Sequence, residues 1–307
     1  MLQFILKRLL SAVFVLWGVM TIIFLLSRMV PVDPVTIMLG EKYDPAIYEQ
    51  LRHSYGLDRP LLQQYLEFLW QLLHGDLGKS YHYVEKPVID ILAAGVPISL
   101  QLGGLAILLE LIIGIPSGIL SAVKQNSWID RTNMGIMMVL YSVPNFVLIP
   151  ICMLVFGVQL RWLPVAGWGT PAHMVLPLAV YTALGTAFYA RLTRTTMLDV
   201  MREDYVRTAR AKGLSEQLVI YGHALRNALI PLISALSPSL AFVVTGAFVI
   251  ETMFNIPGIG YIAIQATQMN DYPVVAGLTL VLAGTVVAMN TLADVLYTVV
   301  DPRIRLQ

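Results

Sequence analysis

The chain contains a single cysteine, Cys152, and a low proportion of charged residues. A disulfide needs two thiols, so no disulfide framework can form within the chain, and a cluster of thiolate metal ligands is excluded for the same reason. Charged residues make up 13% of the sequence and the formal net charge is +1. We therefore expect no basic face of the kind that binds nucleic acid.

The sequence also lacks a complete catalytic or metal-binding motif. Its histidines show no HExxH or paired-ligand spacing, and no GxSxG motif or pair of acids on one helix face indicates hydrolysis. The run Gly78-Lys79-Ser80 resembles the end of a phosphate-binding loop, but Leu73 holds the place of the first glycine of that motif. We expect no catalytic, cofactor-binding or metal-binding residue in this chain.

Apolar residues, by contrast, are abundant: 57% of the chain is hydrophobic and the mean hydropathy is +0.71. This apolar surface exceeds what one soluble core could bury, so the composition predicts an all-α integral membrane protein. A hydrocarbon layer about 30 Å thick needs roughly 20 apolar residues per helix. Six segments have about that length: Leu9–Met29, Leu100–Val123, Met134–Val158, Met174–Ala190, Ala228–Ile250 and Val274–Val300.

Lysine and arginine residues outside these segments predict the orientation of the chain. Short cytoplasmic loops carry an excess of both residues, and an N-terminus in the cytoplasm places most of them on that side, with both termini cytoplasmic. The apolar spacing at residues 58–74 predicts a helix outside the membrane. We divide the chain into an N-terminal transmembrane anchor helix (1–30), an extracytoplasmic segment (31–96), a five-helix transmembrane core (97–300) that includes the polar interruption at residues 199–226, and a cytoplasmic tail (301–307).

Two acidic residues, Glu110 and Asp294, lie within the expected spans. A charge near the bilayer centre costs about 2.5–3.5 kcal/mol on insertion scales, so each side chain should face protein or water. Glu110 is either a pathway or proton-coupling residue, or an acid that lies near a helix end or is neutralised by a basic neighbour, and both interpretations stay open. Asp294 lies near the cytoplasmic end of its span, which favours an acid whose charge reaches the interface.

The polar interruption at residues 199–226 has the pattern of two helices joined by a glycine. Acids near its start and basic residues near position 212 suit the two ends of a helix over 199–212. Gly213 can adopt the left-handed conformation that ends a helix, and Ser215 can cap a second one. We predict a helical corner in the cytoplasm that serves for docking and not for catalysis.

Two runs in this region carry a more specific signal: Glu203-Asp204-Tyr205-Val206-Arg207-Thr208-Ala209-Arg210-Ala211-Lys212-Gly213-Leu214, and His223-Ala224-Leu225-Arg226-Asn227-Ala228 followed by Pro231. They resemble the cytoplasmic coupling loop of ABC-importer permeases in the dipeptide/oligopeptide/nickel transport family, first-permease branch. In its general form that loop reads EAA, three residues, Gly, nine residues, then I-x-L-P. Arg207-Thr208-Ala209 holds the EAA positions and Gly213 matches the glycine. The differences between this sequence and the general form of the loop are typical of the peptide branch.

Shorter motifs along nearly the whole chain resemble the same family in order and spacing. They are Pro31-Val32-Asp33-Pro34, Gly75-Asp76-Leu77-Gly78-Lys79-Ser80, Glu251-Thr252-Met253-Phe254, Pro257-Gly258-Ile259-Gly260, Asp271-Tyr272-Pro273 and Asp301-Pro302-Arg303-Ile304-Arg305. Each is weak alone, but their shared order makes coincidence improbable.

The resemblance implies a type I ABC importer permease fold with six transmembrane helices and an external helical segment after the first, in the bacterial cytoplasmic (inner) membrane. It implies as partners the lipid bilayer, a homologous second permease subunit, two ABC ATPase subunits that hold ATP and Mg, and an extracytoplasmic substrate-binding protein. The implied coupling-loop residues are Glu203, Asp204, Arg207, Thr208, Ala209, Arg210, Ala211, Lys212, Gly213, Leu214 and Ser215. The candidate external gate residues are Glu251, Pro257, Gly258 and Gly260.

The implied substrate is a di- or oligopeptide, with glutathione or a nickel complex as alternatives within the family. Two other classes stay open. An ion-coupled secondary transporter would need coupling residues at the midplane, for which Glu110 is the candidate, and a membrane enzyme would need a catalytic constellation. Ion-driven uptake by the purified chain without an ATPase would support the first, and turnover of a substrate would support the second.

Overall fold

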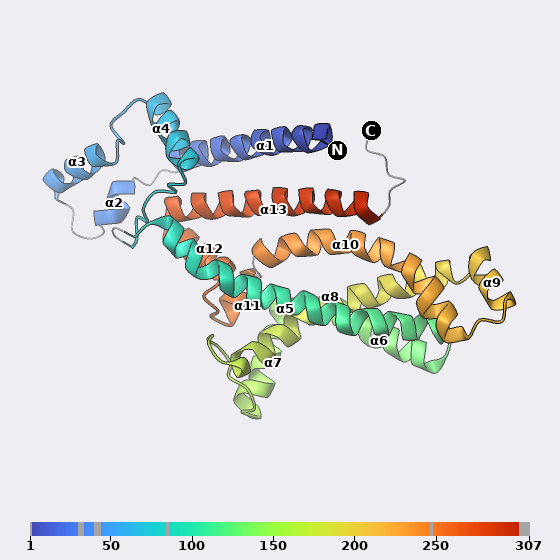
Figure 1. Cartoon of the computed structure of the whole chain (residues 1–307). Coiled ribbons are helices and arrows are strands. Elements are labelled where there is room, and N and C mark those ends of the chain that lie inside the picture. The colour runs from blue at the N-terminus through green and yellow to red at the C-terminus, as the bar shows by residue number, and fades with distance from the viewer. Residues whose placement is uncertain (1, 30–33, 40–43, 84–85, 246–247, 301–307) are drawn as a thin grey trace. The chain divides into compact units, whose positions relative to one another are not determined.

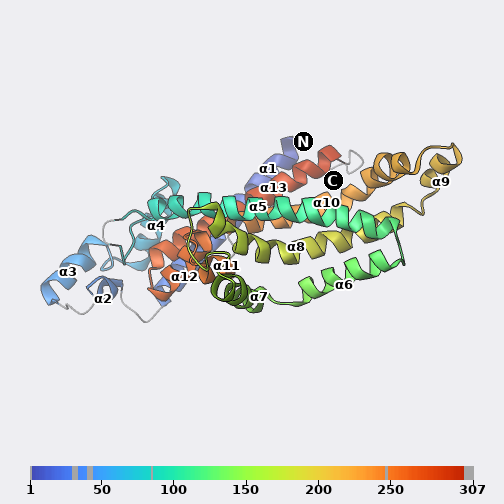
Figure 2. The same ribbon diagram turned by 90° about the horizontal axis from the view of Figure 1, so that it is seen from below.

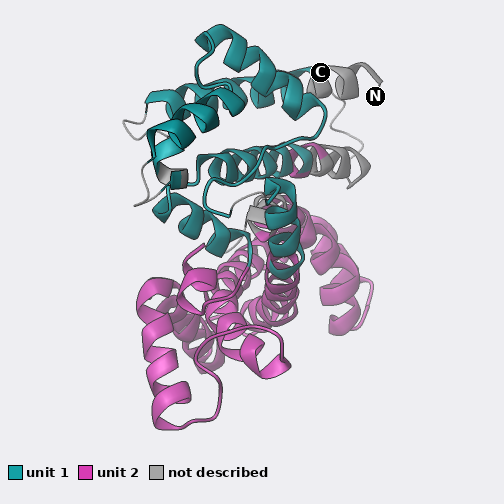
Figure 3. Ribbon diagram, turned by 90° about the vertical axis from the view of Figure 1, so that its left-hand side faces the viewer, with its two compact units in different colours: residues 1–98, 258–288, 306 teal, residues 99–257, 289–305, 307 magenta. Residues whose placement is uncertain are grey.

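The computed structural model describes residues 2–29, 34–39, 44–83, 86–245 and 248–300, with side chains except at 2–9, 34, 37–38, 237–238, 240–242, 244–245 and 292–300. Nearly all of the described chain is helical, and one antiparallel bridge joins Lys79 to Pro87. The chain divides into two compact units (Figure 3). The first is built from residues 1–98 and 258–288, and the second from residues 99–257 and 289–305.

The helices are labelled in Figure 1. The first unit contains α1 (Leu2–Met29), α2 (Pro34–Leu39), α3 (Pro45–Ser54), α4 (Leu61–Leu73), the start of α5 (Val88–Val123), α12 (Ile259–Gln268) and most of α13 (Tyr272–Val300). The second contains the rest of α5, α6 (Trp128–Ser142), α7 (Asn145–Cys152), the π-helical η1 (Met153–Gln159), α8 (Pro171–Val200), α9 (Asp204–Ala211), the π-helical η2 (Leu218–Ala224), α10 (Leu225–Thr245) and α11 (Phe248–Met253).

In the described part of the chain, five helices are long and apolar enough to cross a membrane, and a bent helix pair makes a sixth if it is one span. The five are Leu10–Met29, Val88–Val123, Pro171–Val200, Leu218–Leu236 and Tyr272–Thr291. Each of the five overlaps one expected span, but the bounds differ. α5 and α8 extend well beyond the expected spans, and Leu218–Leu236 begins ten residues before the expected Ala228–Ile250. The helix expected over residues 58–74 is α4.

The third expected span, Met134–Val158, is not one straight helix. It consists of α6 and the helical residues 145–159, and the two are bent by 98°. The break lies at Val143, which is extended (φ −89°, ψ 116°), immediately before Pro144. A proline disfavours helical backbone in the residue before it and cannot donate a backbone hydrogen bond. The expected span is therefore broken at Pro144, and it is the sixth span if the bent pair crosses the membrane as one.

Helix α8 is the centre of the second unit: it contacts α6, α7, α10 and α11, and Figure 2 shows α6 running alongside it. α5 also packs closely against α8 at two glycines that lie one turn apart. A Cβ atom at Gly114 would lie 2.9 Å from the backbone oxygen of Thr186, and one at Gly118 would lie 2.5 Å from that of Ala190. Small residues spaced in this way let helix backbones approach closely in a membrane.

An ion pair that the sequence analysis did not anticipate joins α6 to α8. Both Asp130 carboxylate oxygens accept hydrogen bonds from Arg194, at 2.7 Å from Nε and 2.7 Å from Nη2. Asp130 is 3% exposed, and its Oδ2 also accepts from the Asn126 backbone N–H at 2.9 Å. Bidentate arginine–carboxylate pairs fix geometry as well as charge, so this pair sets the register of the two helices at the end of α8 that leads toward residue 199.

In the first unit, the loop that resembles a phosphate-binding loop holds a carboxylate instead. The Ser80 hydroxyl donates to Oδ2 of Asp271, and the backbone N–H groups of Tyr81 and His82 donate to the same carboxylate at 3.0 and 3.3 Å. Asp271 is 1% exposed. Three donors satisfy this buried carboxyl group, and these contacts bring together the two short motifs around Ser80 and Asp271.

The glycine contact between α5 and α8 generates a stability prediction. We expect Gly118→Ala to lower the free energy of unfolding by about 1–3 kcal/mol, because the added methyl group meets α8 backbone atoms that cannot shift without separating the helices. Gly104→Ala is the matched control on the same helix, since a Cβ there meets nothing within 4 Å. The measurement is unfolding of the purified chain in detergent, and equal stability of the two variants would contradict the close packing.

Candidate functional site

The polar corner (residues 199–226) is built from the end of α8, α9, η2 and the start of α10. Its first helix is interrupted, contrary to the expectation of one helix over residues 199–212: α8 ends at Val200 and α9 begins at Asp204, after the extended residue Glu203 (φ −67°, ψ 148°). The predicted stop is confirmed, because Gly213 has φ +78°, a left-handed conformation that strongly favours glycine. Helical structure resumes at Glu216, directly after Ser215.

A small apolar core holds α9 against the second arm of the corner. Val206 and Ala209, three positions apart on α9, are buried together with Val219 on η2. Val200 and Leu214 pack against this cluster. Residues three apart share a helix face. α9 therefore has one buried apolar face, which contains Val206 and Ala209, and one exposed charged face.

Two polar contacts stiffen the corner further. Arg210 on α9 donates to both carboxylate oxygens of Glu216 across the Gly213 turn, at 3.2 Å from Nε and 2.7 Å from Nη2. The hydrogen bond from Arg210 holds the pKa of the Glu216 carboxyl below its usual value. Asn227 Nδ2 on α10 donates to the Tyr205 hydroxyl at 2.7 Å. These contacts fix α9 to the segment after the Gly213 turn and to α10.

The structure places the expected coupling-loop residues in two groups. Ala209 is buried and Leu214 is half-buried, and both belong to the apolar core of the corner. The others form its exposed surface: Glu203, Asp204, Arg207, Thr208, Arg210, Ala211, Lys212, Gly213 and Ser215. Leu218 and Tyr221, 49% and 60% exposed, add apolar area that the sequence analysis did not single out. The signal in the sequence that could have identified them is the presence of large apolar side chains within a polar segment.

The expected external gate residues lie at the connection between α11 and α12. Glu251 on α11 is fully buried and accepts a hydrogen bond from the Ser99 hydroxyl at 2.8 Å. Pro257 is exposed, whereas Gly258 and Gly260 are buried. Gly258 has an extended backbone (φ −90°, ψ −174°) and precedes α12. The left-handed conformation of the turn occurs at Asn255 (φ 53°) and not at Gly258 or Gly260.

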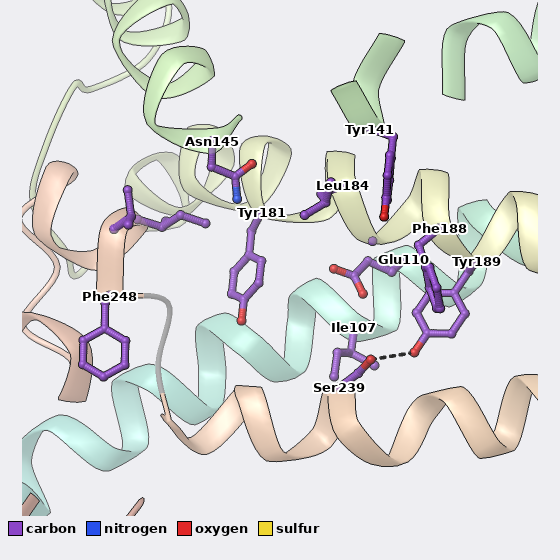
Figure 4. Close-up of a pocket in the computed structure, with 13 residues that line it drawn as sticks. Ile107, Glu110, Tyr141, Asn145, Tyr181, Leu184, Phe188, Tyr189, Ser239 and Phe248 are labelled. Carbon is purple, nitrogen blue, oxygen red and sulfur yellow. Dashed lines mark hydrogen bonds between the residues drawn. The ribbon is translucent and has the colours of Figure 1, made fainter. Parts of the chain in front are cut away.

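The second unit also contains a cavity of about 530 Å³ that surrounds Glu110. Residues from α5, α6, α7, α8, α10 and α11 line it, and several of their side chains are aromatic (Figure 4). Glu110 is 6% exposed, and no hydrogen bond or ion pair joins it to another described residue. This environment does not support the interpretation of Glu110 as an acid neutralised by a basic neighbour.

The other expected intramembrane acid, Asp294, lies in the backbone of α13, and its side chain is outside the described part of the structure. Among the described residues, no cluster of three or more His, Cys, Asp or Glu side chains could hold a metal ion. The cavity around Glu110 is thus a candidate site in addition to the polar corner and the connection between α11 and α12.

Two family models match the chain, and together they span nearly all of it. The binding-protein-dependent transport system inner membrane component matches residues 114–306, and the N-terminal membrane component of the same systems matches residues 1–102. The oligopeptide transport system permease protein OppB of Salmonella typhimurium is 40% identical over 308 residues, which cover 99% of this chain and 100% of that protein. The glutathione transport system permease protein GsiC of Pectobacterium atrosepticum is 38% identical over 305 residues, 99% of each chain.

Among solved structures, an inward-facing MetNI methionine ABC transporter superposes with a TM-score of 0.55 at 21% identity, covering 69% of this chain and 97% of that chain. This likeness shows a shared fold. The family matches confirm the resemblance seen in the sequence, and they do not favour an ion-coupled secondary transporter or an enzyme. Members of this family are multi-pass inner membrane proteins that act with ATPase and binding-protein partners, and ATP hydrolysis occurs in separate subunits. The chain therefore belongs to the family of inner membrane components of binding-protein-dependent transport systems, and it is a permease subunit of an ABC importer.

Proposed function

We propose that this permease imports di- or oligopeptides that an extracytoplasmic binding protein delivers. The observation that carries the proposal is the 40% identity with an oligopeptide permease over the whole chain. The likeness to a glutathione permease at 38% identity makes glutathione, itself a short peptide, the second candidate. Uptake of labelled peptides and glutathione into proteoliposomes that contain the complete importer distinguishes the two.

We propose further that the chain pairs with a homologous second permease, and that two ATPase subunits, which hold ATP and Mg, dock on the two permeases. For this chain the docking surface is the polar corner. Its exposed side chains combine charge with the apolar area of Leu218 and Tyr221, while its inner face packs on α8 and α10 through Val200 and Leu225. A rigid corner of this kind transmits a movement of the ATPase into the transmembrane helices as a rigid-body rotation.

The first prediction from the proposed function concerns the Gly213 turn. A left-handed backbone costs an L-residue about 1–2 kcal/mol, and Asn tolerates it better than other residues. We therefore expect Gly213→Val to disrupt ATPase-subunit assembly or to uncouple ATP hydrolysis from uptake, while Gly213→Asn retains both. The measurements are co-purification of the ATPase and the ratio of transport to hydrolysis. Normal coupling in the valine variant would refute the docking role.

The second prediction concerns orientation, with both termini in the cytoplasm. In a Cys152→Ala background, single cysteines at Lys79 and at Ser215, both exposed, should react with an impermeant maleimide from opposite sides of the membrane. Lys79→Cys should react from outside and Ser215→Cys only after the cytoplasmic side is opened. Labelling of both from one side would disprove this topology.

The third prediction concerns the connection between α11 and α12, which we propose helps to close the external mouth of the pathway. Replacing the exposed Pro257 by alanine removes the fixed φ of the residue that leads into α12. We expect Pro257→Ala to assemble normally but to change how strongly loaded binding protein stimulates ATP hydrolysis. Pro171→Ala, at an exposed proline that begins α8, is the control. An unchanged concentration dependence and maximum would leave the turn as a simple connector.

A further inference from the structure

The buried carboxylate of Glu110 lies against α8 at a position where that helix has no side chain, Gly185. A Cβ atom at Gly185 on α8 would lie 2.0 Å from Cδ of Glu110, and 2.2 and 2.3 Å from its two oxygens. The carboxylate therefore occupies the space that any other residue at position 185 would fill. The glycine leaves this space to the Glu110 side chain, which lines the cavity and points from α5 toward α8 in Figure 4.

No group of the described chain compensates the Glu110 carboxylate. The cationic side chain on the same stretch of α8 is Arg191, and its guanidinium carbon lies 3.9 Å from the centroid of the Tyr141 ring. It stacks on that ring and forms no ion pair with Glu110. The neighbouring Tyr189 hydroxyl is hydrogen-bonded to Ser239 at 2.9 Å. An ionised carboxylate away from water needs a positive partner or a proton.

The remaining lining of the cavity indicates the chemistry of that partner. Tyr181, Phe188 and Phe248 contribute aromatic surface, and Asn145 contributes an amide. Aromatic faces attract organic cations, and a lone carboxylate without further acidic or imidazole ligands does not suit a metal ion. The volume of about 530 Å³ lies within the range of about 300–1,000 Å³ that small-molecule sites occupy. The cavity thus fits an ammonium group attached to an apolar body.

We propose that this cavity is a subsite for the ammonium group of the transported substrate, and that Glu110 is the residue that binds it. The inference rests on the proposed function, in which the substrate is a peptide, because every peptide with a free amino terminus carries such a group at neutral pH. The aromatic side chains receive the first residues of the peptide without reading their sequence. Gly185 is a positioning residue, since it determines where the carboxylate lies.

The test uses the complete importer in detergent, without binding protein, and two probes. Trileucine has a free amino terminus, and N-acetyl-trileucine does not. We expect titration calorimetry to show that the wild-type importer binds trileucine about tenfold more tightly than the acetylated form, because a buried charge pair is lost on acetylation. The nearly isosteric Glu110→Gln should weaken trileucine binding by about tenfold and leave the acetylated peptide unchanged.

Two further variants separate charge from general damage. Gly185→Ala retains the Glu110 charge but displaces the carboxylate, so we expect it to weaken binding of trileucine and not of the acetylated peptide. Thr182→Ala on the same helix is the control, because within the described part of the chain the Thr182 hydroxyl donates only to the backbone oxygens of Leu178 and Ala179 on its own helix. Its binding of both probes should equal that of the wild type.

Equal binding of both probes by the wild type and Glu110→Gln, or no binding of trileucine by the wild type, would overturn the subsite. The two probes would bind equally if the Glu110 carboxyl group were protonated, because it would then carry no charge to pair with the ammonium group. The proposed function fails by a different measurement, if the wild-type importer with its loaded binding protein takes up no peptide into proteoliposomes. Peptide uptake that is normal in Glu110→Gln would reject the subsite and leave the function standing.

Discussion

The close approach of α5 to α8 is the constraint on which the second unit depends. Glu110, Gly114 and Gly118 lie four residues apart on α5 and face α8, so one face of the helix carries an acid and then two residues without side chains. On α8 the facing position is Gly185, followed by backbone atoms of Thr186 and Ala190. In lipid, where apolar surface gives no preference for helix association, such backbone packing is the main source of attraction.

Helix α8 also connects two candidate sites, the cavity around Glu110 and the polar corner. α8 runs from the cavity, which it lines with Tyr181, to Val200, which packs on the apolar core of the polar corner. The Asp130–Arg194 pair ties α6 to the stretch of α8 between them. One helix, whose register is set by the α5 contact on one side and by the Asp130–Arg194 pair on the other, therefore joins the polar corner to the cavity. Rigid secondary structure is one of the elements that can carry coupling between two sites.

The first unit is organised by a different device, in which backbone N–H groups and a hydroxyl surround the Asp271 carboxylate. The glycine-containing loop before α5 thus binds a carboxylate of the protein itself, that of Asp271. This explains why a segment that resembles part of a nucleotide site occurs in a chain whose family leaves ATP hydrolysis to other subunits.

Membrane insertion, the approximate spans, the Gly213 turn and the family were predictable from the sequence alone, because each depends on local composition, periodicity or a contiguous motif. Pro144 could also have predicted the break between α6 and α7, since the effect of proline is local. The Asp130–Arg194 pair, the burial of Glu251 and the contact of Glu110 with Gly185 could not have been predicted, since they join residues 64, 152 and 75 positions apart. Local pattern determines which residues prefer lipid or helix, but which side chains meet depends on how the helices pack, and only the tertiary structure decides that.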